Sequence, residues 1–331
     1  MHLLTAATGS IDMNQDSNAI LTLCSHVCVG EGVRPLEPKE YGGLAQKLNK
    51  AGKSPKDIFE FSSDDFKGVL GCDEEQRERI LRLLDRNASL SISLGEYSNM
   101  GINTVTRADV EYPKKLRQKL GNACPPIFYY AGDTDLLDGQ YIGYVGSRTV
   151  AVEDMEFTKQ AIRKTTSLGY GVVSGGAQGI DTIAEQEALH NGAPVVAYLA
   201  DSMMKKLRSS ETTRNIQGDR LIVLSVSRPD AGFNVGIAMT RNRYIYAQSS
   251  GTVVVRSDLN KGGTWAGANE NLRNNWCVTL CWDQPYPGNK ALIEKGAVPI
   301  GDSWDGTVPE KKVEPETKEV SVQQSFFDIG I

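Results

Sequence analysis

The chain has 331 residues and carries 36 Lys and Arg against 41 Asp and Glu, a formal net charge of −5. With 40% hydrophobic and 23% charged residues, the composition is that of a globular protein and excludes a collagen-like, coiled-coil or wholly disordered chain. No apolar run approaches the roughly 18 residues of a membrane span, and the N-terminus lacks the pattern of a secretory signal. We therefore expect a cytoplasmic protein of two domains that does not contact a membrane.

The cysteines and histidines form no metal-binding pattern. Six cysteines in a chain of this length do not resemble the disulfide framework of a small secreted protein, so reduced thiols are expected. Cys277 and Cys281 lie in the apolar run WCVTLCW, which predicts a buried strand. His190 falls near the end of a helical pattern. We expect neither a bound metal nor a cofactor.

The first third of the chain predicts helices. Residues 1–18 are polar and aperiodic, and we interpret them as a flexible leader. Residues 19–95 follow a helical period, with Ser54-Pro55 typical of a helix start and Gly71 typical of a helix stop. This pattern indicates a small all-helical domain that serves packing or oligomerisation rather than a specific ligand.

The next region, residues 96–300, alternates short β-rich runs with helical periods. Strands are predicted over 141–147 and 170–176, with an amphipathic helix over 153–169 between them. Further runs continue this alternation to about residue 282. The fold class is therefore α/β, with a mostly parallel sheet covered by helices on both faces. Such sheets bind ligands at the carboxyl ends of their strands.

Three glycine-containing turns are predicted at that edge of the sheet, each between a strand and a helix. Glycine permits close backbone approach, and a helix N-terminus presents unpaired N–H groups to an anion. Three such turns on one edge predict a phosphate-binding groove, although each turn alone could serve packing only. The residues are Gly146, Ser147 and Arg148, then Ser174, Gly175, Gly176, Gln178 and Gly179, then Lys261, Gly262, Gly263 and Thr264.

A second basic element is the run Arg241-Asn242-Arg243, predicted at the start of a helix. Cations are unfavourable at a helix N-terminus, and a bound anion would relieve this. The alternative is that these arginines pair with carboxylates such as Asp230 or Asp258. Because the whole chain is acidic, any affinity for nucleic acid must be local and must weaken with salt.

The tail, residues 301–331, is rich in Glu, Lys, Pro and Val, and we interpret it as disordered. It ends in QQSFFDIGI, an apolar cluster that either docks back on the protein or binds a partner. Gln323, Ser325, Phe326 and Phe327 resemble the peptide by which bacterial replication and repair proteins bind the sliding clamp.

Together, the blocks GYVGSR, SGGAQGIDTIAEQEAL, TRNRYIYAQS and KGGTWAGANENL, preceded by YPKKLRQKLGNACPPIFYYAGDTDLL, resemble the DprA/Smf family of DNA-processing proteins. The resemblance covers about 105 to 300 and rests on the order and spacing of all blocks. It implies a Rossmann-like domain, usually a homodimer, that binds single-stranded DNA and helps load the RecA recombinase. By position, the three turns and Arg241 to Arg243 match the family's phosphate-contacting elements, and no catalytic residue transfers.

Several positions depart from the family pattern. Ala238 and Val235 stand where the family often has an aromatic and a basic residue, and Phe233 is the nearest aromatic that could stack on a base. Glu185 replaces a common histidine, and no winged-helix pattern follows residue 300. The function expected is thus a non-enzymatic, single-stranded-DNA-binding accessory protein of recombination or DNA uptake.

Two alternatives remain. A nucleotide sensor or phosphoribohydrolase-like enzyme could use a related fold, but the phosphoribohydrolase signature places Gly-Gly, then Gly-Thr, and a Glu about three residues later. Here Glu270 follows Thr264 by six residues. A scaffold that binds only protein, with the turns kept for packing, is the third possibility.

Overall fold

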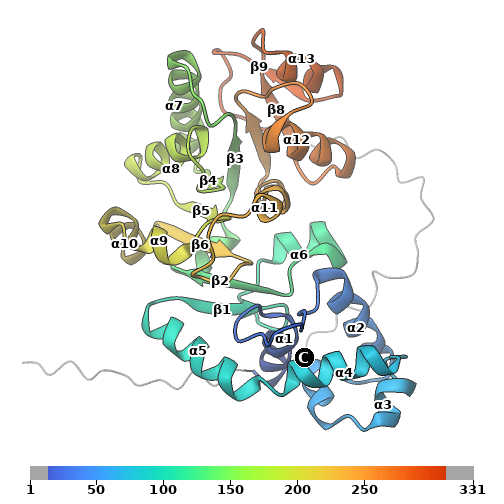
Figure 1. Ribbon diagram of the computed structural model, residues 1–331. Helices are drawn as coiled ribbons and strands as arrows, with labels where there is room; N and C mark the ends of the chain where they lie inside the picture. Colours follow the sequence, from blue (N-terminus) through green and yellow to red (C-terminus); the bar gives the residue numbers. More distant parts are fainter. Residues whose placement is uncertain (1–13, 311–331) are drawn as a thin grey trace, which may run out of the picture.

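The computed structural model describes residues 14–310, which form a helical domain followed by an α/β domain (Figure 1). The helical domain packs on the antiparallel edge of the sheet, where the Ser25 and Tyr129 hydroxyls lie 2.8 Å apart. Its helices are α1 (Gln15–Cys24), α2 (Pro38–Lys50), η1 (Pro55–Glu60), α3 (Ser63–Gly68), α4 (Glu74–Leu84) and α5 (Asn87–Asn99).

The first helix begins earlier than the sequence pattern indicates. The Asn14 side chain accepts a hydrogen bond from Asp16 N at 3.0 Å and so caps α1 at Gln15. Residues 15–18, assigned to the leader from the sequence, are therefore helical. The predicted start at Ser54-Pro55 is present, with Pro55 opening η1.

A single nine-stranded sheet runs through the α/β domain in the order β1-β2-β6-β5-β4-β3-β7-β8-β9. All pairs from β6 to β9 are parallel, whereas β1 and β2 pair antiparallel at one edge. The strands are β1 (Asn103–Thr106), β2 (Ile127–Ala131), β3 (Tyr141–Val145), β4 (Gly171–Ser174), β5 (Val195–Tyr198), β6 (Leu221–Ser225), β7 (Gly251–Val254), β8 (Val278–Trp282) and β9 (Val298–Ile300).

Helices cover both faces of this sheet, which confirms the predicted fold class. One apolar core joins the sheet to α7, α8 and α9, and a second joins its other face to α6, α11, α12 and α13. The helices are α6 (Lys114–Leu120), η2 (Gly121–Ala123), η3 (Thr134–Asp138), α7 (Val152–Ser167), α8 (Ile180–His190), α9 (Met203–Leu207), α10 (Ser210–Gln217), α11 (Val235–Gln248), α12 (Gly262–Asn274) and α13 (Pro287–Glu294).

The packed chain continues past residue 300, the boundary expected from composition. Lys164 Nζ donates to Asp302 O at 2.6 Å, and Trp304 and Val308 pack against the core. The terminal motif of Gln323, Ser325, Phe326 and Phe327 lies outside the described residues. Within residues 14–310, no helix has both the length and the apolarity to cross a membrane.

Candidate nucleic-acid interface

The three predicted turns meet at the carboxyl edge of the sheet. We call them the first turn (146–148), the central turn (174–181) and the third turn (261–264). The Thr264 hydroxyl donates to Gly146 O at 3.0 Å, and Ile180 N donates to Ser147 O at 3.4 Å. The sequence-predicted juxtaposition of these segments is therefore present.

The central turn, however, uses its own N–H groups internally. Gly175 N donates to the Asp181 carboxylate at 3.0 Å, and Gly176 N donates to the Ser174 hydroxyl at 3.0 Å. The Asp181 carboxylate occupies the place at the start of α8 that an anionic ligand would take. Gly175 and Gly176 therefore have no free N–H group for a phosphate, and the phosphate-binding role of the central turn stays a prediction.

Arg241 is also part of this internal arrangement. Because α11 begins at Val235, Arg241 lies within the helix and not at its N-terminus, so the helix-dipole argument for a bound anion is wrong. Its side chain is 6% exposed and its guanidinium lies 3.5 Å from Asp181. A Cβ at Gly175 would stand 0.9 Å from Arg241 Nη1, so only glycine leaves room for the guanidinium.

Burial governs the titration of this pair. Loss of water around the Asp181 carboxylate raises its pKa to about 6, although Arg241 and the Gly175 N–H act in the opposite direction. Burial likewise lowers the pKa of Arg241, with Asp181 opposing the shift. Asp181 of the central turn and Arg241 of α11 therefore form a buried charge pair, in which Arg241 Nε has no hydrogen-bond partner among residues 14–310.

The other two residues of the Arg241-Asn242-Arg243 run also form contacts within the protein. Arg243 Nε lies 2.7 Å from a Glu270 carboxylate oxygen, and Asn242 Nδ2 donates to Gly263 O at 3.0 Å. The carboxylate alternative is confirmed for both arginines, with Asp181 and Glu270 as partners in place of Asp230 and Asp258. The sequence spacing did not indicate Glu270 as the partner of Arg243, because Glu270 lies on the next helix, α12.

The first and third turns carry the cations that stay open. Arg148 and Lys261 are exposed, and neither forms an ion pair with any residue of 14–310. The Arg148 guanidinium lies 5.1 Å from the ring centroid of Phe233, which is 49% exposed. Lys261 precedes α12, whose first N–H groups have no acceptor inside the helix. We call Arg148, Lys261 and Phe233 the rim.

A further cation at this edge is engaged. Arg256, just after β7, lies 3.2 Å from the buried Asp154 of α7, and the Tyr286 hydroxyl donates to the same carboxylate at 2.8 Å. This contact fixes the chain after the first turn against the end of β7. Within the three turns, Arg148 and Lys261 are thus exposed cations that form no ion pair with residues 14–310.

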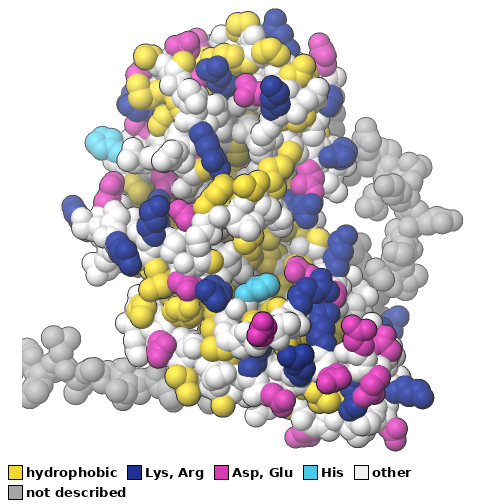
Figure 2. Space-filling model, viewed as in Figure 1, with side chains coloured by type: hydrophobic (Ala, Val, Ile, Leu, Met, Phe, Trp, Pro, Cys, Tyr) yellow, Lys and Arg dark blue, Asp and Glu magenta, His cyan; other side chains and the backbone are white. Residues whose placement is uncertain are grey.

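Charge on the surface agrees with a local site. On the face in Figure 2, Lys and Arg side chains are interspersed with Asp and Glu and do not form one continuous basic band. A row of apolar side chains crosses the middle of this face, at the position of α11 in Figure 1. Exposed apolar residues near the start of α11 are Val235 and Met239.

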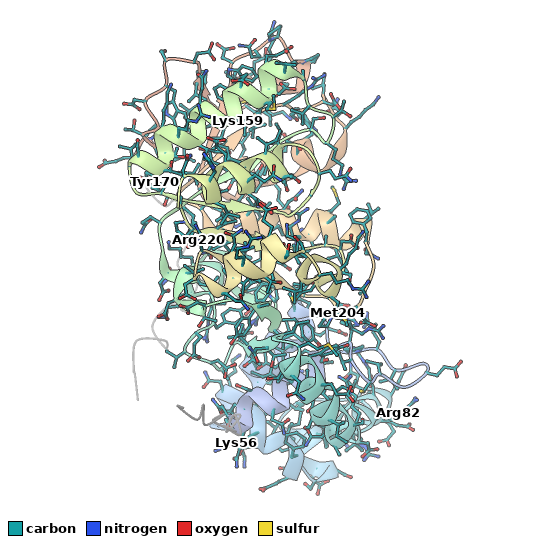
Figure 3. The ribbon with its side chains drawn as sticks, turned by 90° about the vertical axis from the view of Figure 1, so that its left-hand side faces the viewer. Lys56, Arg82, Lys159, Tyr170, Met204 and Arg220 are labelled. Atoms are coloured by element: carbon teal, nitrogen blue, oxygen red, sulfur yellow. The ribbon has the colours of Figure 1, made fainter. Side chains whose placement is uncertain are left out.

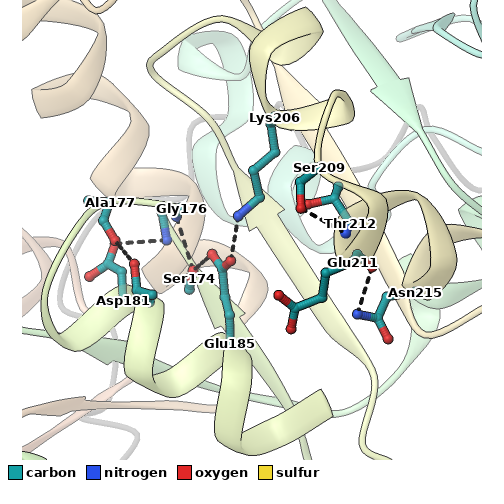
Figure 4. A network of polar contacts seen from close by, with 12 residues as sticks. Ser174, Gly176, Ala177, Asp181, Glu185, Lys206, Ser209, Glu211, Thr212 and Asn215 are labelled. Carbon is teal, nitrogen blue, oxygen red and sulfur yellow. Dashed lines mark hydrogen bonds and ion pairs between the residues drawn. The ribbon is translucent and has the colours of Figure 1, made fainter. Parts of the chain in front are cut away.

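A pocket of about 340 Å³ adjoins the central turn, between α8, α9 and α10. Figure 4 shows part of its polar wall, in which Glu185 contacts both Ser174 and Lys206. Sequence reasoning did not find this pocket, because α9 and α10 were not predicted and their side chains meet α8 only in the folded chain. Cys277 and Cys281 are buried in the sheet, as predicted, and no cluster among residues 14–310 could hold a metal.

Comparison with known proteins agrees with this geometry. The family model described as DNA recombination-mediator protein A matches residues 103–307, more than half of the chain. The chain belongs to this family. The recombination-mediator match spans the whole sheet from β1 to β9 and all three turns, so the family expected from the sequence motifs is confirmed.

Relatives and solved structures place the family match in context. DNA processing protein DprA of Bacillus subtilis (strain 168) is 26% identical over 228 residues, which cover 67% of this chain and 76% of the relative. The structure of DprA from Streptococcus pneumoniae aligns with a TM-score of 0.61 at 20% identity, over 80% of this chain and 95% of that one. DNA processing protein A from Helicobacter pylori aligns with a TM-score of 0.51 at 24% identity, over 62% and 92%. At these identities the two structures show a shared fold.

Proposed function

We propose that this recombination-mediator protein binds single-stranded DNA through its rim and acts as a non-enzymatic accessory factor in DNA recombination. The observation that carries the proposal is that Arg148 and Lys261, on turns that touch each other, are exposed cations without a carboxylate partner in the described chain. Arginine and lysine in this state are the usual ligands of a phosphate backbone.

The neighbouring aromatic ring suits a single strand. Phe233 is half exposed and lies beside the Arg148 guanidinium, and an aromatic face next to a phosphate ligand can stack an unpaired base of any sequence. Phe233 thus takes the part that the resemblance assigns to position 238, which is Ala here. The Helicobacter pylori protein that shares this fold is described as binding single-stranded DNA, which supports the proposal.

Binding of a labelled oligonucleotide at several salt concentrations tests this function. We expect a single strand to bind more tightly than a duplex of equal length, with affinity that falls steeply as salt rises. Equal affinity for both forms, or binding that does not respond to salt, would contradict the proposal.

The hydrolase alternative loses support from one contact. Glu270, the first carboxylate after the third turn, lies 2.7 Å from Arg243 in an ion pair, so it is not free at the turn to act on a bound nucleotide. We therefore propose binding without catalysis. Release of a free base from any of a panel of nucleoside monophosphates would overturn this.

The partners implied by the family resemblance are proposals too. We propose that the chain forms a homodimer, contacts RecA, and binds the sliding clamp through Gln323 to Phe327. Mass measurement in solution tests the dimer. Capture by purified RecA or by the purified clamp tests the two partners, with Phe326 and Phe327 replaced by Ala as the control.

A further inference from the structure

The pocket between α8, α9 and α10 differs from the rim in its chemistry. Its volume of about 340 Å³ lies at the small end of the range for ligand sites, about 300–1,000 Å³. Gly176 of the central turn and Phe233 of the rim both line it. A strand held at the rim therefore passes beside the pocket.

The pocket presents hydrogen-bond acceptors that the described chain leaves unused. Asn215 is 8% exposed, and its Nδ2 donates to Glu211 O at 3.0 Å, but its side-chain oxygen accepts no hydrogen bond from residues 14–310. The Glu211 carboxylate makes neither a hydrogen bond nor an ion pair within that range, and in Figure 4 it points across the pocket toward Glu185. Glu211 is exposed, and neither its carboxylate nor the Asn215 side-chain oxygen is among the buried atoms that lack a partner, so both acceptors are open to solvent and to a ligand that donates.

The charges of the pocket do not favour a phosphate group inside it. Each cation in the wall already has a carboxylate partner, and Glu211 remains as an uncompensated negative charge. The pairs are Lys206 with Glu185 at 2.8 Å, Lys205 with Asp201 at 3.5 Å, and Arg241 with Asp181 at 3.5 Å. The rim attracts an anion, whereas the pocket attracts a group that carries N–H donors.

Apolar side chains complete the wall. Leu189, Leu199 and Leu221 line the pocket together with Phe233, so it has apolar surface for a ring as well as acceptors for amino hydrogens. Nucleobases that bear an exocyclic amino group combine these two properties. Thymine and uracil lack that group, and carboxylate acceptors select the amino group of cytosine.

We propose that this pocket is a nucleobase site that selects amino-bearing bases, with Glu211 and Asn215 accepting from the base. The base comes from the strand at the rim or from a free mononucleotide, and the two sources share this chemistry. The first source rests on the proposed function.

Paired oligonucleotides of dC and dU, equal in length and measured at one salt concentration, test the pocket with the full chain. The two differ in the amino group and the ring N–H, so the phosphate contribution cancels. We expect dC to bind about tenfold more tightly than dU, the factor that one good base contact supplies. Glu211→Gln should reduce this preference, because the amide also offers a donor. Glu78→Gln, an exposed carboxylate of α4, is the matched control and should keep it.

A second arm measures cytidine and uridine monophosphates alone. If the wild type binds cytidine monophosphate but not uridine monophosphate, and Glu211→Gln binds neither, the pocket also accepts free nucleotides. Equal affinity for dC and dU, with no discrimination between the monophosphates, overturns the inference while single-strand binding stands. If neither oligonucleotide binds, the proposed function fails. The inference about the pocket is then tested by whether the protein distinguishes cytidine from uridine monophosphate.

Discussion

The central turn and the rim carry the same kind of sequence pattern, a glycine-containing turn that leads into a helix with arginine or lysine nearby, and they fold into opposite electrostatic states. In the central turn, Asp181 accepts the N–H of Gly175 and pairs with Arg241, all of it buried. At the rim, Arg148 and Lys261 face solvent without a carboxylate. A glycine-rich turn therefore predicts an anion site only when the chain does not supply the anion itself.

Removing the buried cation Arg241 is the strongest test of whether the central turn is structural while the rim is not. Arg241→Ala leaves Asp181 charged and without its partner, so we expect a loss of about 3–5 kcal/mol in the free energy of unfolding. Denaturant unfolding followed by circular dichroism measures it. Arg82→Ala in the helical domain, where Arg82 is exposed (Figure 3), should cost less than about 1 kcal/mol. An equally small effect of Arg241→Ala would show that the central pair is not structural.

The pH dependence of stability tests whether the Asp181 carboxyl is buried in the folded chain. Asp181 has a pKa of about 6 in the folded chain against 3.8 for the free side chain. The folded state therefore holds its proton more tightly, and this favourable contribution is complete below about pH 4 and is lost as pH rises through 6. We expect about 3 kcal/mol to be lost between these limits. Asp181→Asn should remove this part of the pH profile. Identical profiles for both proteins would contradict the buried-pair account.

Phe233 tests the aromatic part of the rim. Phe233→Ala should weaken single-strand binding by about 1–3 kcal/mol, the contribution of one stacked base, with little change in stability because the ring is half exposed. Competition with a labelled oligonucleotide measures the affinity. The matched control is Phe59→Ala, an exposed ring of the helical domain. Equal losses for the two variants would remove Phe233 from the interface.

The smallest expected effect comes from converting an engaged cation into an open one. Glu270→Gln removes the partner of Arg243, whose side chain is 38% exposed. We expect single-strand affinity to rise a few-fold and the salt slope to steepen by at most about 0.7, the share of one phosphate contact. A fall in affinity would show that the Glu270 pair itself supports the interface.

Much of the fold could be predicted from the sequence because it depends on local patterns. Alternating strands and helices and the turn glycines are encoded within short segments, and the turns converge because parallel strands end at one edge. The contacts that the arginines make could not be predicted from such local patterns. Whether Arg241 meets Asp181 or a ligand depends on helix packing across 60 residues, and the start of α11 at Val235 moved Arg241 into the interior of its helix. The pocket was missed for the same reason, since Glu185, Glu211 and Asn215 come together only in the folded chain.

The salt dependence of single-strand binding tests the central claim most directly. The measurement compares the wild type with Arg148→Ala/Lys261→Ala and with Arg82→Ala/Lys56→Ala, two cations of the helical domain labelled in Figure 3. The account predicts that the rim variant lowers the slope of log affinity against log salt by about 1.4, from two lost phosphate contacts, and that the helical-domain variant leaves the slope unchanged. Equal slopes for all three proteins would contradict it.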